Sequence, residues 1–304
     1  MADLESDMPY EAFTKKWAKK PGIKLLLSKD IWGNKQKAIF LKSEEKDDQM
    51  TSIITVAGIS SRFNKGISEN EKVLKCIYTD DSLEDTLLYH MAGKLSSSER
   101  IIIVGGYRYD DLEKYINGFM NGRFESEFTL VRNDHYADLS SGYSLYLGIE
   151  KALNYEPDEI VFVEGDLDID GESVDRVLNA ASNVCTYNHE PIYSDKAVVL
   201  YTDADDRIKY AFNSSHGMLQ INDPFGCILN SGQMWKFKDM HALRRVNDEF
   251  CLRYRDSTNL RIIQSYLDSV DRNSVSLVGL DQWTNCNTRE DYFNIRERWS
   301  GRKV

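Results

Sequence analysis

From about residue 51 onward, the chain alternates short apolar runs with segments whose apolar residues recur at helical spacing. The helical segments lie at 81–95, 109–120 and 142–153. Because strands buried on both faces read as continuous apolar runs, this alternation predicts a parallel sheet with crossover helices on both faces. The apolar runs are TSIITVAG (51–58), RIIIVGGY (100–107), EFTLVRN (127–133) and EIVFVEGDLDID (159–170).

The later part of this region is less regular. Three closely spaced runs predict hairpin-like strands: AVVLYTD (197–203), IKYAFN (208–213) and HGMLQI (216–221). A helical pattern follows at 237–269, and a last strand is expected at 275–280. The fold class expected is therefore α/β, with a Rossmann-like, mixed but mainly parallel sheet flanked by helices.

Residues 1–50 have a different pattern and are expected to form an N-terminal extension of unknown role. They contain a candidate amphipathic helix at 10–19, an apolar IKLLL segment at 23–27 and a charged linker at 43–49. Residues 51–304 are expected to form the functional domain. The extension is compatible with an arm that joins a homodimer and with a regulatory segment.

Composition narrows the classes of function. With 49 acidic and 38 basic residues among 304, the formal net charge of −11 argues against nucleic-acid binding and against an anionic membrane surface. No apolar stretch approaches the roughly 20 residues that a membrane span requires, so no membrane insertion is expected. The five cysteines are scattered without a CxxC pair, which favours a reducing, cytoplasmic location.

The first apolar run ends in a loop of small residues, Ala57-Gly58-Ile59-Ser60-Ser61-Arg62. A glycine at a strand end lets backbone N–H groups approach a ligand, serines add small donors, and the arginine adds charge, so the loop has the composition of an anion-binding site. An ordinary strand-to-helix turn is the simpler alternative. The loop lacks the GK[ST] ending of a P-loop and the GxGxxG spacing of a dinucleotide-binding turn.

Together with Lys72, which follows Gly58 by 72 − 58 = 14 residues, the loop resembles the signature of the nucleotidyltransferase superfamily, AGxGSRF followed by PKxL. Ser60 stands in place of the second glycine and Glu71 in place of the proline. The resemblance implies that Ala57, Gly58, Ser60 and Ser61 bind nucleotide, and that Arg62 and Lys72 act on its phosphates.

A second stretch, VRNDHYADLSSGYSL (131–145), resembles the NNxYSL segment of phosphocholine-type cytidylyltransferases, with Ser140 and Ser141 replacing the asparagines. The resemblance places Asn133 and Ser141 near the nucleotide. If the acceptor carries an ammonium group, aromatic side chains are expected to bind it by cation–π attraction. The candidates are Tyr136, Tyr143, Trp235 and Trp283, although any single one of them is more often an ordinary core or surface aromatic than a ligand-binding residue.

Carboxylates follow the last of the parallel-type runs, at Glu164, Asp166, Asp168 and Asp170. Closely spaced carboxylates repel one another unless a cation intervenes, and oxygen ligands favour Mg²⁺ or Mn²⁺. The resemblance implies that Asp166 in Gly165-Asp166 binds the metal, with Asp168 as a helper. Asn287 in NCNTREDYF matches a second metal position of the family, although the same residues also read as a helix cap.

The function implied is transfer of a cytidylyl group from CTP to a phosphorylated or phosphonate acceptor, such as a phosphocholine- or aminoethylphosphonate-like molecule, with release of pyrophosphate. Three alternatives stay open: a sugar-1-phosphate nucleotidyltransferase, a GT-A type glycosyltransferase that uses Asp166-Leu167-Asp168 as a DxD motif, and a non-catalytic nucleotide-binding protein of the same fold.

Overall fold

The computed structural model describes residues 23–29, 36–42, 49–193, 198–212 and 219–301. By its contacts the chain separates into two compact units, Met1–Asp48 and Gln49–Val304. The helix predicted at 10–19 lies outside the described residues, as does the predicted charged linker apart from Gln49.

The first unit contains a β-hairpin. Strands β1 (Ile23–Lys29) and β2 (Gln36–Lys42) pair antiparallel, with Leu26 opposite Ile39. The apolar IKLLL segment is therefore a strand.

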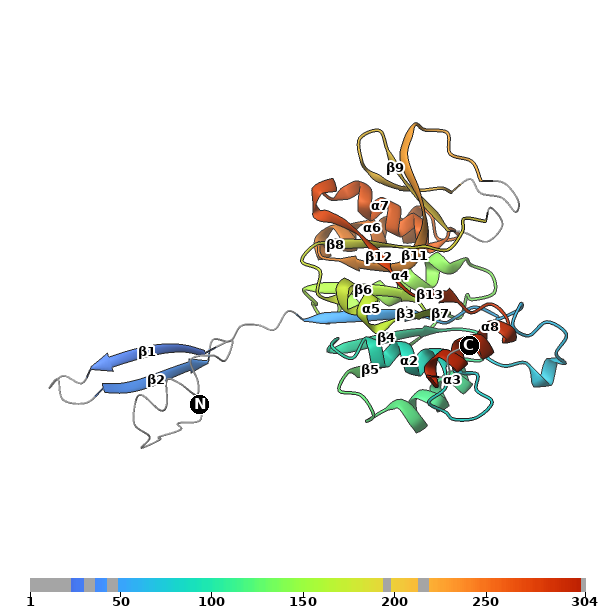
Figure 1. Cartoon of the computed structure of the whole chain (residues 1–304), viewed down its shortest axis with the longest axis horizontal. Helices are drawn as coiled ribbons and strands as arrows, with labels where there is room; N and C mark the ends of the chain where they lie inside the picture. The colour runs from blue at the N-terminus through green and yellow to red at the C-terminus, as the bar shows by residue number, and fades with distance from the viewer. Residues whose placement is uncertain (1–22, 30–35, 43–48, 194–197, 213–218, 302–304) are drawn as a thin grey trace. The chain divides into compact units, whose positions relative to one another are not determined.

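The second unit is built on four parallel strands in the order β6-β3-β4-β5 (Figure 1). The central side chains of β3, β4 and β6, such as those of Ile102 and Phe162, are fully buried because both faces of the sheet are covered, whereas those of the edge strand β5 are half-buried. The prediction of a mainly parallel α/β sheet is confirmed. The strands are β3 (Met50–Thr55), β4 (Arg100–Gly105), β5 (Glu127–Arg132) and β6 (Glu159–Glu164).

Beyond β6 the sheet becomes mixed. The long strand β11 (Phe225–Phe237) runs antiparallel to β6 and also pairs with β8 (Asn183–Asn188) and β9 (Val199–Asp203). Strand β10 (Ile208–Tyr210) forms a hairpin with β9, and β12 (Val275–Leu280) runs parallel to β8. The strand predicted at 275–280 is thus confirmed, and those predicted at 197–203 and 208–213 are confirmed over Val199–Asp203 and Ile208–Tyr210, while residues 197 and 213 lie outside the described part. A strand was also predicted at 216–221. Residues 219–221 do not belong to any strand, and residues 216–218 lie outside the described part.

The sequence pattern did not predict β8 and β11, because polar or small residues interrupt both: Asn and Thr in β8, and Gly, Asn, Ser and Gln in β11. Inside the sheet these polar groups bond to neighbouring backbone: Thr186 Oγ1 donates to the Met234 carbonyl at 2.7 Å, and Asn188 Nδ2 donates to the Ser231 carbonyl at 2.9 Å. The continuous helix predicted at 237–269 is also wrong. Phe237 ends β11, and the helical part is divided in two at residues 254–258.

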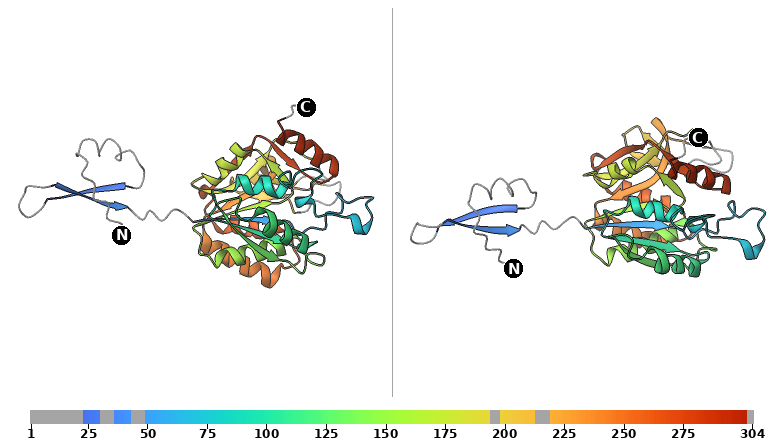
Figure 2. Two further views of the ribbon diagram at one scale, coloured as in Figure 1. Left: turned by 90° about the horizontal axis from the view of Figure 1, so that it is seen from below. Right: turned by 60° about the horizontal axis from the view of Figure 1, so that its bottom comes forward.

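Helices cover both faces of the sheet (Figure 2). On one face, α2 (Leu87–Lys94), α3 (Tyr109–Tyr115, continued by a π-helical turn, Ile116–Met120) and α5 (Gly171–Leu178) pack into one hydrophobic cluster. On the other face, α4 (Ser141–Leu153), α6 (Met240–Arg253) and α7 (Asn259–Ser269) pack into a second cluster. Helix α2 begins later than predicted because the Thr86 side chain accepts a hydrogen bond from the Tyr89 N–H and caps the helix there.

The last strand and helix of the chain pack against segments that follow the parallel strands β3 and β6. Strand β13 (Trp283–Asn285) pairs antiparallel with β7 (Leu167–Ile169), and helix α8 (Arg289–Trp299) follows. Tyr292 of α8 belongs to a third buried cluster with Phe63, which lies in the loop after β3. Short helical turns occur at Glu69–Glu71 (η1), Lys75–Ile77 (η2) and Arg272–Ser274 (η4). Within the described residues, no helix is both long enough and apolar enough to cross a membrane.

Candidate active site

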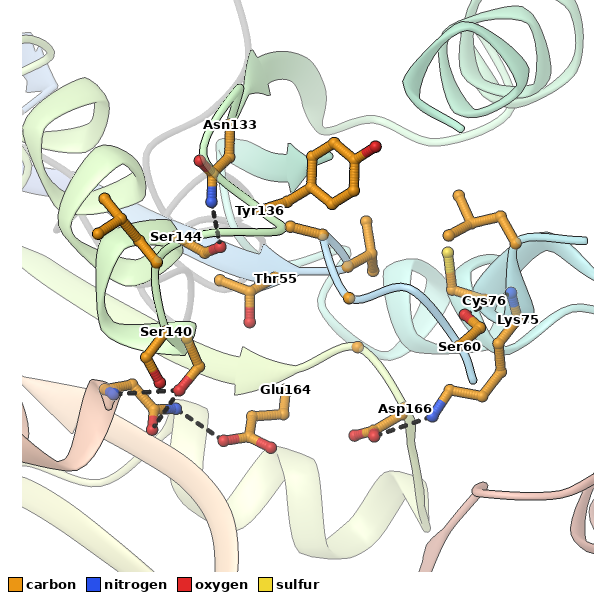
Figure 3. Close-up of a pocket in the computed structure, with 18 residues that line it drawn as sticks. Thr55, Ser60, Lys75, Cys76, Asn133, Tyr136, Ser140, Ser144, Glu164 and Asp166 are labelled. Carbon is orange, nitrogen blue, oxygen red and sulfur yellow. Dashed lines mark hydrogen bonds and ion pairs between the residues drawn. The ribbon is translucent and has the colours of Figure 1, made fainter. Parts of the chain in front are cut away.

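A cleft of about 270 Å³ opens beyond the carboxyl ends of β3 and β6 (Figure 3). This is the edge at which ligands bind in open parallel sheets. Its walls come from the loop after β3, the turn η2, the connection from β5 to α4, the acidic turn after β6, and the start of α7. The lining residues are Thr55 to Gly58, Ser60, Leu74 to Cys76, Asn133, Tyr136, Leu139 to Ser141, Ser144, Glu164 to Asp166 and Asn259.

The loop after β3 contributes Ala57, Gly58 and Ser60, three of the residues expected to bind nucleotide, to the lining of the cleft. Ser60 has a φ of 53°, a left-handed conformation that costs a residue with a side chain about 1–2 kcal/mol. This conformation explains why a glycine suits the position that Ser60 occupies. The Ser60 hydroxyl accepts a hydrogen bond from the Lys75 N–H at 3.3 Å, which ties the loop to η2. Ser61 and Arg62 are exposed and do not line the cleft.

The two lysines of this region point to different places. Lys72 Nζ pairs with Glu69 at 2.5 Å on η1, and Lys72 is not among the residues that line the cleft. Lys75 Nζ pairs with Asp166 Oδ2 at 3.0 Å inside the cleft, where the two side chains are 15% and 26% exposed. Motif spacing selects Lys72, whereas the structure brings Lys75 to the acidic turn (Figure 3). The signal for Lys75 in the sequence is only that it lies three residues later, at the start of a helical turn.

Asp166 is held close to β3 because Gly165 precedes it. A Cβ added to Gly165 would lie 2.3 Å from Val56 Cγ1 and 2.9 Å from the Thr55 carbonyl oxygen, so only glycine lets the turn approach β3 this closely. Asp166 Oδ2 faces Lys75, and Asp166 Oδ1 is buried without a hydrogen-bond partner among the described residues.

Asp168 does not line the cleft. Its carboxylate is 2% exposed and lies within 3.0 Å of Lys94 Nζ and 3.3 Å of an Arg298 Nη, and it also accepts hydrogen bonds from Trp299 and Gln282. Burial alone would raise the pKa of Asp168, but the charge of Lys94 and these hydrogen bonds outweigh it and keep the pKa below its ordinary value. Asp168 therefore fastens α2 and α8 to the acidic turn, and the expectation that it helps to hold a metal is corrected.

Asn287 lies on the segment next to Asp166, because the Cys286 N–H donates to the Asp166 carbonyl at 2.8 Å. Its predicted role in a helix cap is confirmed in part: Thr288 and Asp291 form a capping box at the start of α8, and the Asn287 N–H also donates to Asp291 at 2.9 Å. The Asn287 side-chain oxygen, however, is buried without a partner among the described residues.

Unpartnered oxygens are concentrated beside the acidic turn. Six buried side-chain N or O atoms in the described part of the chain lack a hydrogen bond, and three of them are Asp166 Oδ1, Asn285 Oδ1 and Asn287 Oδ1. These residues lie on adjacent backbone, since Asn285 pairs with Leu167. Buried oxygens normally find a donor or a cation, and carboxylate and amide oxygens suit Mg²⁺ or Mn²⁺. The described residues contain no group of three or more His, Cys, Asp and Glu side chains suited to a metal ion, so any ion here would depend on amide oxygens as well.

The wall opposite the acidic turn is polar and uncharged. Asn133 Nδ2 donates to Ser144 Oγ at 2.9 Å, while Asn133 Oδ1 accepts from the His135 N–H. Ser141 lies at the start of α4, where its hydroxyl accepts from the Asn259 N–H at 3.2 Å. Asn133 and Ser141, both predicted to bind nucleotide, thus lie in the same cleft as Gly58 and Asp166.

The four aromatic candidates do not come together. Tyr136 lines the cleft. Trp235 is fully buried in the sheet, stacked on Phe162 with ring centroids 5.1 Å apart, so its predicted role in acceptor binding is corrected to one in the core. The other two lie outside the cleft lining: the Tyr143 hydroxyl accepts from Arg255 at 3.2 Å, and Trp283 Nε1 donates to the Gly232 carbonyl at 2.9 Å.

Two residues that the sequence pattern did not assign stand out at the floor of the cleft. Glu164 accepts hydrogen bonds from Asn259 Nδ2 at 2.7 Å and from Gln233 Nε2 at 3.0 Å. Burial raises the pKa of Glu164 to about 7, and the charge of Asp166 adds to this, although the two amide donors oppose it. Asn259 comes from α7, more than ninety residues later in the chain, so no local pattern could connect it to the acidic turn.

Comparison with known proteins is consistent with this architecture. The sequence profile of a family described as Domain of unknown function (DUF6564) matches residues 71–299. No curated protein matches the chain by sequence.

Among solved structures, the inositol-1-phosphate CTP transferase of T. maritima superposes with a TM-score of 0.57 at 16% identity, covering 84% of this chain and 99% of that one. The CTP:phosphocholine cytidylyltransferase of Streptococcus pneumoniae has a TM-score of 0.55 at 16% identity over 83% and 99% of the two chains. A putative glucose-1-phosphate thymidylyltransferase of Bacillus anthracis has a TM-score of 0.58 at 15% identity over 84% and 96%. The resemblance to the nucleotidyltransferase superfamily is therefore confirmed at the level of the fold.

Proposed function

The chain belongs to the DUF6564 family, and we propose that it transfers a cytidylyl group from CTP to a small phosphorylated or phosphonate molecule. The observation that carries the proposal is the cleft beyond β3 and β6, in which Lys75 and Asp166 face each other beside the glycine-containing loop. An anionic chain of phosphates and a cation need this combination of a lysine, a carboxylate and backbone N–H groups. The choice of CTP is supported by two of the structural neighbours, which are named as an inositol-1-phosphate CTP transferase and a CTP:phosphocholine cytidylyltransferase.

The proposed reaction forms no covalent bond between the protein and a substrate. An ionised oxygen of the acceptor forms a bond to the α-phosphorus of CTP, and the bond from that phosphorus to the bridging oxygen breaks, so that pyrophosphate leaves with the electron pair. Because the acceptor oxygen is already ionised near neutral pH, no general base is needed. The protein has to align the two substrates and offset their charge.

Each part of the cleft has a role in this proposal. The backbone at Ala57 and Gly58 holds the triphosphate, and Lys75 offsets charge at the α-phosphate. Arg62, four residues after Gly58 on the same loop, is exposed and is assigned to the leaving pyrophosphate. Asp166, with the amide oxygens of Asn285 and Asn287, would hold Mg²⁺ or Mn²⁺. When bound, the ion supplies positive charge that polarises the phosphate oxygens.

The glycosyltransferase alternative is less well supported. The second carboxylate of this DxD sequence is not free to bind a metal, because every oxygen of Asp168 already faces a protein donor away from the cleft. A sugar-1-phosphate acceptor is a closer alternative, because one neighbour is named as a thymidylyltransferase for glucose 1-phosphate.

Pyrophosphate release is the test of this proposal. The four ribonucleoside triphosphates, each with Mg²⁺, are combined with phosphocholine, 2-aminoethylphosphonate, inositol 1-phosphate and glucose 1-phosphate. We expect acceptor-dependent release with CTP above the other three nucleotides. Release with another nucleotide would correct the base, and nucleotide binding without product in any combination would favour a non-catalytic protein.

Replacement of the two lysines separates their roles. Lys75→Met is expected to weaken binding of CTP with Mg²⁺ by about tenfold or more, because a charged contact to phosphate is lost inside the cleft. Lys72→Met is the matched control and should change the dissociation constant by less than about threefold. Isothermal titration measures both. The reverse ranking would mean that Lys72, not Lys75, meets the phosphates.

A further inference from the structure

Glu164 is a carboxylate fixed at the floor of the cleft. Each of its two oxygens accepts a hydrogen bond from a different side-chain amide, Asn259 on Oε1 and Gln233 on Oε2. In Figure 3 the Glu164 side chain lies between Ser140 and Asp166. Two amides holding one carboxylate fix its orientation, so its remaining lone pairs have a defined direction.

Backbone strain at Gln233 accompanies the hydrogen bond that its side-chain amide donates to Glu164. Gln233 is 5% exposed and has a φ of 55°, at the point where the pairing register of β11 shifts between Ser231 and Trp235. A left-handed residue inside a strand costs about 1–3 kcal/mol and persists only where the surroundings enforce it. The irregular strand thus turns an amide donor toward Glu164.

The Asn259 amide connects Glu164 to the wall assigned to the nucleotide. The backbone N–H of Asn259 donates to Ser141 Oγ at 3.2 Å, and Ser141 Oγ lies 3.4 Å from Asn259 Oδ1. Ser141 begins α4, next to Ser140 on the cleft wall. Glu164, at the end of β6, is therefore connected to the start of α4 through Asn259.

The negative charge of the cleft restricts which ligand groups can lie next to Glu164. Among the described residues, the charged ones that line the cleft are Glu164, Asp166 and Lys75, and Lys75 is already paired with Asp166. A second carboxylate repels phosphate groups, so a triphosphate tolerates it only where the ligand offers hydrogen-bond donors instead. In a nucleoside triphosphate the uncharged donors next to the phosphates are the ribose hydroxyls, and a carboxylate is a suitable acceptor for them.

On the basis of the proposed function, we infer that Glu164, held by Asn259 and Gln233, accepts a hydrogen bond from a ribose hydroxyl of the bound nucleotide. The site thereby selects ribonucleoside over deoxyribonucleoside triphosphates. The acceptor molecule has no part in this selection.

The test is binding without acceptor. CTP, 2′-deoxy-CTP and 3′-deoxy-CTP are titrated with Mg²⁺ into the wild-type protein, and if the panel prefers another base, its ribo- and deoxy-forms are used. We expect one of the two deoxynucleotides to bind about tenfold more weakly than the ribonucleotide, because a hydrogen bond to a buried carboxyl group is lost. In Glu164→Gln this preference should fall to less than about threefold, mainly through weaker binding of the ribonucleotide. Glu113→Gln, an exposed carboxylate on α3, serves as the control that keeps the preference.

A second variant keeps the test valid if Glu164→Gln lowers the thermal stability of the protein too far for binding measurements. Gln233→Ala keeps the carboxylate and removes one of its supports, so the preference should decrease by about threefold or more. Equal affinity for all three nucleotides in the wild type, or an unchanged preference in a folded variant, would overturn the inference while leaving the proposed function standing. An effect of Glu164→Gln on acceptor KM alone would also overturn it. Failure of every triphosphate to bind would remove the proposed function and this inference together.

Discussion

Replacing Asp166 with asparagine is expected to lower the rate of pyrophosphate release by about a hundredfold or more, with little effect on folding. The carboxylate is the charged member of the group of oxygens proposed to hold the metal, and a neutral amide binds a divalent ion less tightly. The lost pair with Lys75 is partly exposed, so the free energy of unfolding should fall by only about 1 kcal/mol or less.

The measurement is steady-state turnover with CTP, Mg²⁺ and the best acceptor, together with thermal unfolding of each variant. Asp175→Asn, an exposed carboxylate on α5, is the matched control and should leave both quantities unchanged. A folded Asp166→Asn protein that turns over at the wild-type rate would refute the role given to Asp166.

Replacing Asp168 with asparagine is expected to have the opposite profile, with a loss of about 3 kcal/mol in the free energy of unfolding. The substitution removes the negative charge that Lys94 and Arg298 share, and it presents an amide N–H₂ to donors that need an acceptor. Helices α2 and α8 should therefore loosen from the acidic turn.

Urea unfolding of Asp166→Asn and Asp168→Asn side by side distinguishes the two aspartates of the DxD sequence. We expect the midpoint of Asp168→Asn alone to fall clearly. Wild-type stability combined with abolished turnover in Asp168→Asn would instead support a metal role for Asp168 and revive the glycosyltransferase interpretation.

Much of the fold follows from local pattern. The apolar runs that end near Gly58, Tyr107 and Asp170 are buried on both faces, as a parallel strand inside a covered sheet requires, whereas the run that ends near Asn133 forms the half-buried edge strand β5. The same runs locate the cleft, because the carboxyl ends of neighbouring parallel strands lie at one edge of the sheet. Local pattern therefore places Gly58 and Asp166 at the same edge of the sheet, and the pairing of β3 with β6 brings them into one cleft.

What the pattern missed depends on packing between distant segments. Strand β11 has a polar sequence around Asn230, Ser231 and Gln233, and its identity as a strand comes from pairing with β6, β8 and β9. Trp235 resembles a ligand-binding aromatic in the sequence, but its place in this central strand buries it completely. Tertiary context decides strand positions more strongly than intrinsic propensity does.

The site residues show the same division. Motif spacing leads to Lys72, yet the direction of a side chain depends on the turn that carries it, and the turn beginning at Lys75 is the one that faces Asp166. The role of Asp168 depends on Lys94, Arg298 and Trp299, which come from two helices far away in the sequence. No spacing rule within the acidic turn could distinguish Asp166 from Asp168.

The central claim is that one triphosphate and one cation bind together between the loop after β3 and the acidic turn after β6. A crystal structure of the protein with CTP and Mg²⁺ tests it most directly. We predict an ion on Asp166 with oxygen distances of about 2.0–2.1 Å, and phosphate oxygens in contact with Lys75 and with the backbone at Gly58. A nucleotide bound outside this cleft, or one bound inside it with phosphates that meet neither Lys75 nor an ion on Asp166, would contradict the claim.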